Sequence, residues 1–217
     1  ERSFDASRGS FVEAMRADGV PLSDLDRRVL VQARQIYVFS HAALLGWKGP
    51  GLALARAAFA GMTARYWHDE GGWCFSLAPD FSRRDPRRRT YDQAFAIFAC
   101  AWYFRASGDR TALDWAERTL KALDALFAHP AGGYREGLPD SAPRRQNPHM
   151  HLLEALLALY AASGRQQHLD HARHIAALFA ERFFDARRGI VHEELDDALH
   201  PLPDASGFEP GHHFEWA

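Results

Sequence analysis

The chain has 217 residues, 47% of them hydrophobic and 25% charged, which is typical of a globular protein with one sizeable core. Its 26 basic and 28 acidic side chains give a formal charge of −2, so no global positive field draws in nucleic acid or an anionic membrane. No apolar run approaches the roughly 20 residues that a membrane-spanning helix needs. We therefore expect one domain over residues 1–217, with neither nucleic acid nor a membrane as partner.

The termini and the cysteines bear on compartment and completeness. Cys74 and Cys100 lie in apolar surroundings, which favours free thiols in a reducing compartment, and the charged start "ERSFDASRGS" has no signal-peptide core. The cytoplasm is the expected location. The end "EPGHHFEWA" stops inside an apparent helix start, so the domain is expected to be incomplete at its C-terminus.

In chain order, the predicted elements alternate between two kinds of helix. The first kind is apolar nearly all round, whereas the second carries charges on one face and apolar residues at three-to-four spacing. A glycine-aromatic loop follows each pair. Helices of the first kind are expected at "VQARQIYVFSHAALLGW" (31–47), from Tyr91 and from Asn147, and "GHHFEW" (211–216) begins a further unit.

The units repeat with a fixed period. Residues 91–134 lie over residues 147–190 without a gap, so Tyr91 falls on Asn147, Gly108 on Gly164 and Gly133 on Gly189, each 56 positions apart. A fixed period of this length is typical of stacked helical hairpins.

The polarity of the helices predicts two concentric layers. A helix that is apolar on all sides must be covered on all sides, so the first helices lie inside and the second helices outside. This describes an all-α protein, either an open solenoid or a closed α/α toroid. The long loops at 69–90, 129–146 and 185–210 each connect an outer helix to the next inner helix. They therefore gather at one end of the molecule, where a site is expected.

Polar residues are concentrated where the inner helices begin. Taken singly, each is more often a satisfied core group or a helix cap, but their recurrence in successive units favours a functional cavity. Asn147, His151 and Glu154 share one helical face, and His149 points elsewhere. Trp73, on a loop, is expected to stack on a sugar at the cavity mouth. The residues predicted to line the cavity are Arg34, Tyr91, Asn147, His151, His212 and Glu215.

Two other features have an ordinary interpretation. The run "RRDPRRR" at 83–89 is expected to be a solvated loop, with the binding of a negatively charged sugar substituent as its alternative role. A catalytic metal is not expected, because histidines two apart on a helix (His149 and His151) diverge and cannot share one ion. The oligomeric state is left open, with a homodimer as one candidate.

Several of these segments resemble the N-acylglucosamine 2-epimerase superfamily, which includes mannose isomerases, sulfosugar isomerases and cellobiose 2-epimerases. The segments are "RQNPHMHLLEALLALY", "EPGHHFEWA", "RRTYDQAFAIFA" and "VQARQIYVFSHAA". Within them, "PGHHFEWA" and "YVFSHAA" are more similar to the mannose-isomerase and sulfosugar-isomerase branch than to the cellobiose branch. The resemblance implies an (α/α)6 toroid of six hairpins, of which this chain supplies about the first half.

The resemblance also implies roles for individual residues. Arg34 would bind the reacting oxygens of the sugar, Asn147 and His151 would bind substrate, and Tyr91 would line the site. His212 and Glu215 would form the acid/base apparatus, together with a second catalytic histidine beyond residue 217. The fragment alone is therefore expected to be inactive.

The implied chemistry is cofactor-independent conversion of an aldose into a ketose, of the D-mannose/D-fructose type, through a cis-enediolate. Histidine suits the proton transfer because both of its protonation states occur near neutral pH. Glu215 is expected to orient His212, as carboxylates commonly do for catalytic imidazoles. The alternatives are a sugar 2-epimerase, an α/α-toroid glycoside hydrolase using Glu154 and Glu215, and a helical-repeat binding protein.

Overall fold

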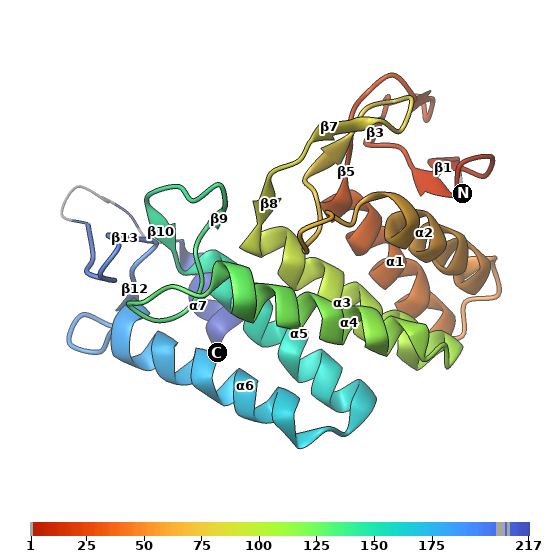
Figure 1. Cartoon of the computed structure of the whole chain (residues 1–217). Helices are drawn as coiled ribbons and strands as arrows, with labels where there is room; N and C mark the ends of the chain where they lie inside the picture. The colour runs from red at the N-terminus through yellow and green to blue at the C-terminus, as the bar shows by residue number, and fades with distance from the viewer. Residues whose placement is uncertain (1, 203–206, 208) are drawn as a thin grey trace.

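A computed structural model describes residues 2–202, 207 and 209–217, and it folds as two layers of helices (Figure 1). Helices α1, α3 and α5 lie side by side, with α3 between the other two. Each is followed by an outer helix packed against it: α2 on α1, α4 on α3 and α6 on α5. The α-helices are α1 (Val29–Leu44), α2 (Gly51–Arg65), α3 (Thr90–Ser107), α4 (Thr111–Ala122), α5 (Asn147–Ser163), α6 (Gln166–Leu178) and α7 (Pro210–Trp216).

The period of 56 residues is visible in the backbone as well as in the sequence. Gly108 and Gly164 end α3 and α5 with φ of 72° and 68°, a left-handed conformation that glycine adopts without steric cost. Single π-helical turns then close the two outer helices, η1 (Leu123–Phe127) after α4 and η2 (Phe179–Phe183) after α6. These turns also lie 56 residues apart, so the predicted repeat is confirmed.

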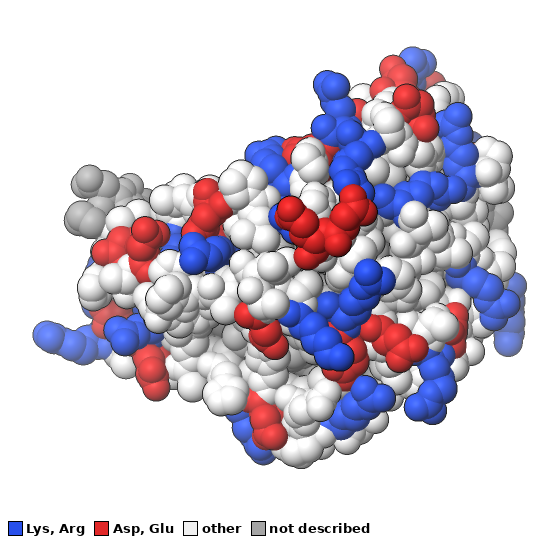
Figure 2. Space-filling model, viewed as in Figure 1, with Lys and Arg blue, Asp and Glu red and all other residues white. Residues whose placement is uncertain are grey.

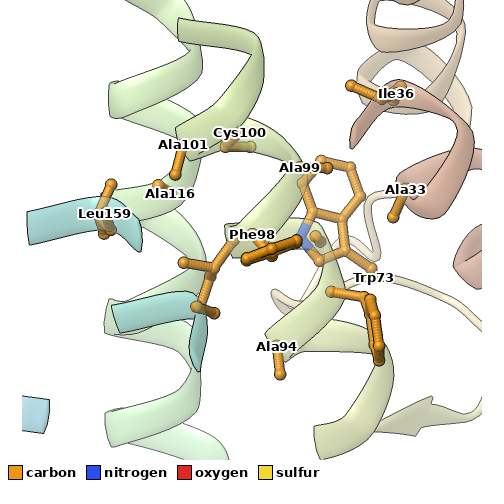
Figure 3. Packing of buried hydrophobic residues seen from close by; sticks show 14 of the residues in the cluster. Ala33, Ile36, Trp73, Ala94, Phe98, Ala99, Cys100, Ala101, Ala116 and Leu159 are labelled. Carbon is orange, nitrogen blue, oxygen red and sulfur yellow. The ribbon is translucent and has the colours of Figure 1, made fainter. Parts of the chain in front are cut away.

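Burial follows the predicted division between inner and outer helices. In α3, residues 92–101 are all buried, whereas α4 buries Ala112, Leu113, Ala116, Thr119 and Leu120, one stripe at three-to-four spacing. Figure 2 shows acidic and basic side chains intermingled on the face that carries α4 and α6, as expected for the solvent side of outer helices. Small residues such as Ala99, Ala101 and Ala116 lie where α3 meets its neighbours (Figure 3).

Short antiparallel strands fill the loops between the hairpins, and they lie at the end of the molecule where α1, α3 and α5 begin (Figure 1). The three-stranded sheet β5–β6–β7 and the pairs β8–β9 and β10–β13 connect neighbouring loops, while β1–β2, β3–β4 and β11–β12 are local hairpins. The strands are β1 (Phe4–Asp5), β2 (Ser10–Phe11), β3 (Ala14–Met15), β4 (Pro21–Leu22), β5 (Arg27–Arg28), β6 (Ser76–Leu77), β7 (Arg83–Asp85), β8 (Arg88–Arg89), β9 (Gly137–Leu138), β10 (Arg144–Arg145), β11 (Phe184–Asp185), β12 (Ile190–Val191) and β13 (Glu194–Leu195).

Candidate active site

One side chain near the start of each inner helix, here called the anchor, holds the preceding loop. It accepts a hydrogen bond from a loop backbone N–H over 2.7–3.0 Å. Because residues two apart on a helix point in nearly opposite directions, the residue two positions after each anchor faces away from the loop. Those residues are Arg34, Phe95, His151 and Glu215, and all four line one cavity. The anchors and their loop partners are Gln32 with Phe11, Gln93 with Trp73, His149 with Tyr134 and His213 with Val191.

The cavity has a volume of about 510 Å³, within the range usual for small-molecule sites. On one side, the Arg34 guanidinium lies 4.4 Å from the Phe95 ring centre, and its Nη2 donates to the Tyr91 hydroxyl over 3.0 Å. Burial raises the pKa of Tyr91, so its hydroxyl stays protonated while it accepts this bond. Arg34 is therefore held in one orientation with its other N–H groups available to an oxygen-rich ligand.

His151 lies across the cavity, between two carboxylates. Its Nδ1 is 3.2 Å from Glu154 Oε2 and its Nε2 is 3.9 Å from Glu215 Oε2. Its ring meets that of Tyr91 edge-on at 5.1 Å. The structure thus brings Arg34, Tyr91, His151 and Glu215 into one cluster at the inner-helix starts.

His212 lies on α7, one turn before Glu215, and a different carboxylate contacts it. Its Nδ1 is 2.9 and 3.0 Å from the two oxygens of Glu193, and its Nε2 is 3.0 Å from Asn147 Nδ2. The expectation that Glu215 orients His212 is therefore wrong, since the Glu215 carboxylate faces His151 and Glu193 contacts His212. Sequence reasoning missed Glu193, because it lies 19 residues before His212 in a loop.

The contacts of His212 with Glu193 and Asn147 are consistent with one tautomer. A carboxylate favours the proton on Nδ1, which leaves the lone pair of Nε2 to accept the Asn147 amide. The Gln146 amide nitrogen also lies 2.9 Å from Nδ1, and in this tautomer its N–H₂ donates to Glu193. Asn147 Oδ1 is buried and has no hydrogen-bond partner among the described residues, so a ligand hydroxyl would satisfy it. Nε2 is thus the atom of His212 suited to take a proton.

Trp73 does not line this cavity. It is fully buried, packed against Trp67 and Trp115, and its Nε1 donates to Thr119 Oγ1 over 2.9 Å. Figure 3 shows its indole inside the core among residues of α1 and α3. Gln93 pulls its backbone inward by accepting the Trp73 N–H over 2.7 Å. The expectation that Trp73 stacks on a sugar is therefore wrong, because its ring has no exposed face.

A second cavity, of about 500 Å³, lies beside the first, and the last three residues of the arginine-rich loop line it. Arg87, Arg89 and Arg145 line it together with Tyr91 and Asn147. Each guanidinium already has a carboxylate partner: Arg87 pairs with Asp85, Arg89 with Asp92 and Arg145 with Glu194.

The sequence analysis predicted that the whole of this loop is solvated, but one of its arginines is buried. Arg88 is buried, and its guanidinium donates to the Gly71 carbonyl over 2.8 Å and to Glu70 over 3.0 Å. Arg27 and Arg144 are buried at the corresponding positions of the neighbouring units, each five residues before an anchor. These arginines hold loops in place.

Among residues 2–202, 207 and 209–217, no three His, Cys, Asp or Glu side chains form a group that could hold a metal ion. No helix there is long and apolar enough to cross a membrane.

Comparison with known proteins identifies relatives along the whole chain. The model of the family "N-acylglucosamine 2-epimerase (GlcNAc 2-epimerase)" matches residues 9–217. A mannose-6-phosphate isomerase of Rhizobium meliloti is 36% identical over 224 residues, covering 100% of this chain and 57% of the relative. A cellobiose 2-epimerase of Ruminococcus albus is 29% identical over 209 residues, covering 88% of this chain and 52% of the relative. The chain thus spans about half the length of these relatives.

The fold has solved counterparts. A crystal structure of a D-mannose isomerase superposes with a TM-score of 0.89 at 23% identity, covering 99% of this chain and 59% of that chain. This likeness, together with the two helical layers, confirms the predicted α/α toroid, of which this chain forms about half.

Proposed function

The chain belongs to the N-acylglucosamine 2-epimerase family, and from that premise we propose that the full-length protein is a sugar isomerase that interconverts an aldose and a ketose of the D-mannose/D-fructose type. The observation that best supports this proposal is a set of groups at one end of the toroid. The His212 imidazole has a carboxylate at Nδ1, and Arg34 is held in one orientation beside a cavity of monosaccharide size. A 2-epimerase that shares the first proton transfer is the alternative.

In the proposed reaction, His212 Nε2 removes the proton from the carbon next to the carbonyl of the open-chain sugar. The electron pair of that C–H bond forms a double bond to the carbonyl carbon, and the carbonyl π pair moves onto its oxygen, giving a cis-enediolate with negative charge on oxygen. Arg34 stabilises this charge through N–H groups that Tyr91 and Phe95 hold in place. The hydroxyl proton on the second oxygen of the enediolate moves to the first, and returning the carbon-bound proton to the neighbouring carbon then gives the ketose.

Other residues would bind the sugar. Asn147 offers a buried carbonyl oxygen without a partner among the described residues, and His151 offers a ring nitrogen facing Glu215 over 3.9 Å. Both groups suit hydroxyls, which donate and accept at once. No cofactor is needed for the proton transfer, because the reaction changes no overall oxidation state.

A sugar phosphate is the second candidate substrate. The arginine-lined cavity beside Tyr91 and Asn147 favours it, and the Rhizobium relative is named a mannose-6-phosphate isomerase. Against it stands the carboxylate partner that each of Arg87, Arg89 and Arg145 already has. A phosphate would have to displace these pairs, so the neutral monosaccharide is preferred.

The test is proton NMR of the full-length protein in D2O, with D-mannose, D-fructose, mannose 6-phosphate and N-acetylmannosamine offered separately. Deuterium entering at C2 while mannose and fructose interconvert is the expected result, and His212→Ala should abolish it. Exchange only with N-acetylmannosamine would make the protein an epimerase. Release of reducing ends from oligosaccharides without any exchange would instead support a glycoside hydrolase.

A further inference from the structure

Three loops place a glutamate at the same structural position. Each glutamate lies two residues after the loop residue that bonds the anchor side chain, and its carboxylate accepts the backbone N–H of the residue four positions before the anchor. The glutamates and the residues whose N–H groups they accept are Glu13 with Arg28 (3.1 Å), Glu136 with Arg145 (2.6 Å) and Glu193 with Glu209 (3.2 Å). A structural role is thus common to all three: each ties a loop to the entry of the next inner helix.

Of these three glutamates, only Glu193 also contacts an imidazole. Glu13 and Glu136 use their remaining capacity on arginine side chains, Arg28 and Arg145. In the last unit, His212 lies at that point, with Nδ1 2.9 and 3.0 Å from the two carboxylate oxygens. The repeat therefore supplies its own comparison between a glutamate that only tethers and one that contacts a proposed base.

The carboxylate of Glu193 is fixed from a second direction. Gln146 is fully buried, and its Oε1 accepts the indole N–H of Trp216 over 2.6 Å, so its amide N–H₂ points the other way. That N–H₂ donates to Glu193 Oε2 over 2.8 Å. With three donors around it and only 18% of its side chain exposed, Glu193 has little freedom to turn from His212.

We infer that Glu193 is the positioning residue of the proposed acid/base histidine. It holds the proton of His212 on Nδ1, directs Nε2 toward the substrate, and stabilises the imidazolium that forms when Nε2 accepts a proton. This inference rests on the proposed function. Glu215, 52% exposed and facing His151, is left to interact with the sugar.

The experiment compares Glu193→Gln with the matched variant Glu13→Gln in the full-length protein. Glutamine keeps an oxygen for the backbone N–H in both loops but removes the charge beside His212. We expect kcat for C2 proton exchange to fall about 10⁴-fold in E193Q with KM within about threefold, as when the carboxylate behind another catalytic imidazole is replaced by its amide. E13Q should keep the wild-type kcat.

Two results would overturn the inference: wild-type kcat in E193Q, or an equal loss of kcat in E13Q, which would mean that both glutamates only tether their loops. Nitrogen-15 NMR of His212 gives a readout that does not require turnover. The wild-type ring should carry its proton on Nδ1, and E193Q should shift protonation toward Nε2. If the wild-type protein exchanges no sugar proton, the proposed function fails, and an unchanged tautomer in E193Q would then separately refute the positioning role.

Discussion

His149 Nε2 accepts the backbone N–H of Tyr134 over 2.9 Å, while its Nδ1 lies 3.1 Å from the carbonyl oxygen four residues earlier. Gln93 makes the same two bonds one unit before, accepting the Trp73 N–H over 2.7 Å and donating to the carbonyl four residues earlier over 3.1 Å. Glutamine and neutral histidine thus form the same two hydrogen bonds at this position. They differ because histidine can also take up a proton.

His149→Gln should remove part of the acid sensitivity of the fold. Burial lowers the pKa of His149 from 6.5 to about 4. Between these values the unfolded chain binds a proton that the folded chain does not, so stability from this group is complete above pH 6.5 and falls as the pH drops toward 4. Between pH 7 and pH 5, H149Q should lose about 2 kcal/mol less unfolding free energy than the wild type. Urea unfolding at both pH values measures this.

The control for that prediction is the same comparison between about pH 9 and pH 8, where the His149 ring is neutral in the folded and in the unfolded chain. The unfolding free energies of H149Q and the wild type should change equally there. An H149Q variant that loses stability as steeply as the wild type between pH 7 and pH 5 would show that His149 takes up no proton on unfolding in that range.

Gly133→Ala should be far more costly than Gly189→Ala, although the two glycines are equivalent in the repeat. Their φ values are 62° and 66°, so alanine at either position pays for the left-handed conformation, about 1 kcal/mol. A Cβ at Gly133 would also lie 2.5 Å from His149 Nε2 and 2.7 Å from Leu178 Cδ2, whereas nothing lies within 4 Å at Gly189. The overlap should add about 2 kcal/mol, as overpacking commonly does. Equal losses of unfolding free energy in denaturant titrations would contradict this.

The repeat explains why the fold could be predicted from the sequence. Gly108 and Gly164 end equivalent helices with the same backbone angles, and an apolar stripe such as Leu113, Ala116 and Leu120 shows which side of a helix is buried. Both signals are local in the chain, with periods set by helix geometry. The cluster around Arg34 and His151 followed from the same logic, since it comes from equivalent positions.

Two features of the site depend on contacts that no local pattern encodes. A glycine-aromatic loop does not reveal whether Trp73 turns inward, which depends on Gln93 and Thr119 in two different helices. Likewise, Glu215 lies one helical turn from His212, whereas the carboxylate in contact with His212 belongs to Glu193, 19 residues earlier in a loop. The contact with His212, rather than the residue period, distinguishes Glu193 from the equivalent glutamates of the other loops.

Trp73→Phe should reduce stability without affecting substrate binding. The smaller ring leaves a gap beside Trp67 and Trp115 and loses the bond to Thr119, for a cost of about 2–3 kcal/mol. Since the indole is buried, KM for the sugar should stay within about twofold. Thermal unfolding and initial rates test the two parts separately, and a raised KM at unchanged stability would restore Trp73 to the site.

Arg34→Lys and Tyr91→Phe should show coupled losses of activity. Lysine cannot reproduce the planar guanidinium that stacks on Phe95 and donates to Tyr91, so kcat/KM for isomerisation should fall about 100-fold. Phenylalanine at 91 removes only the hydroxyl that orients Arg34, which should cost about tenfold. If Tyr91 acts through Arg34, removing its hydroxyl from the lysine variant should cost much less than tenfold, because the interaction is already lost. Initial rates of the wild type, both single variants and the double variant complete the cycle. Losses that multiply in the double variant would mean that Tyr91 contacts the sugar independently of Arg34.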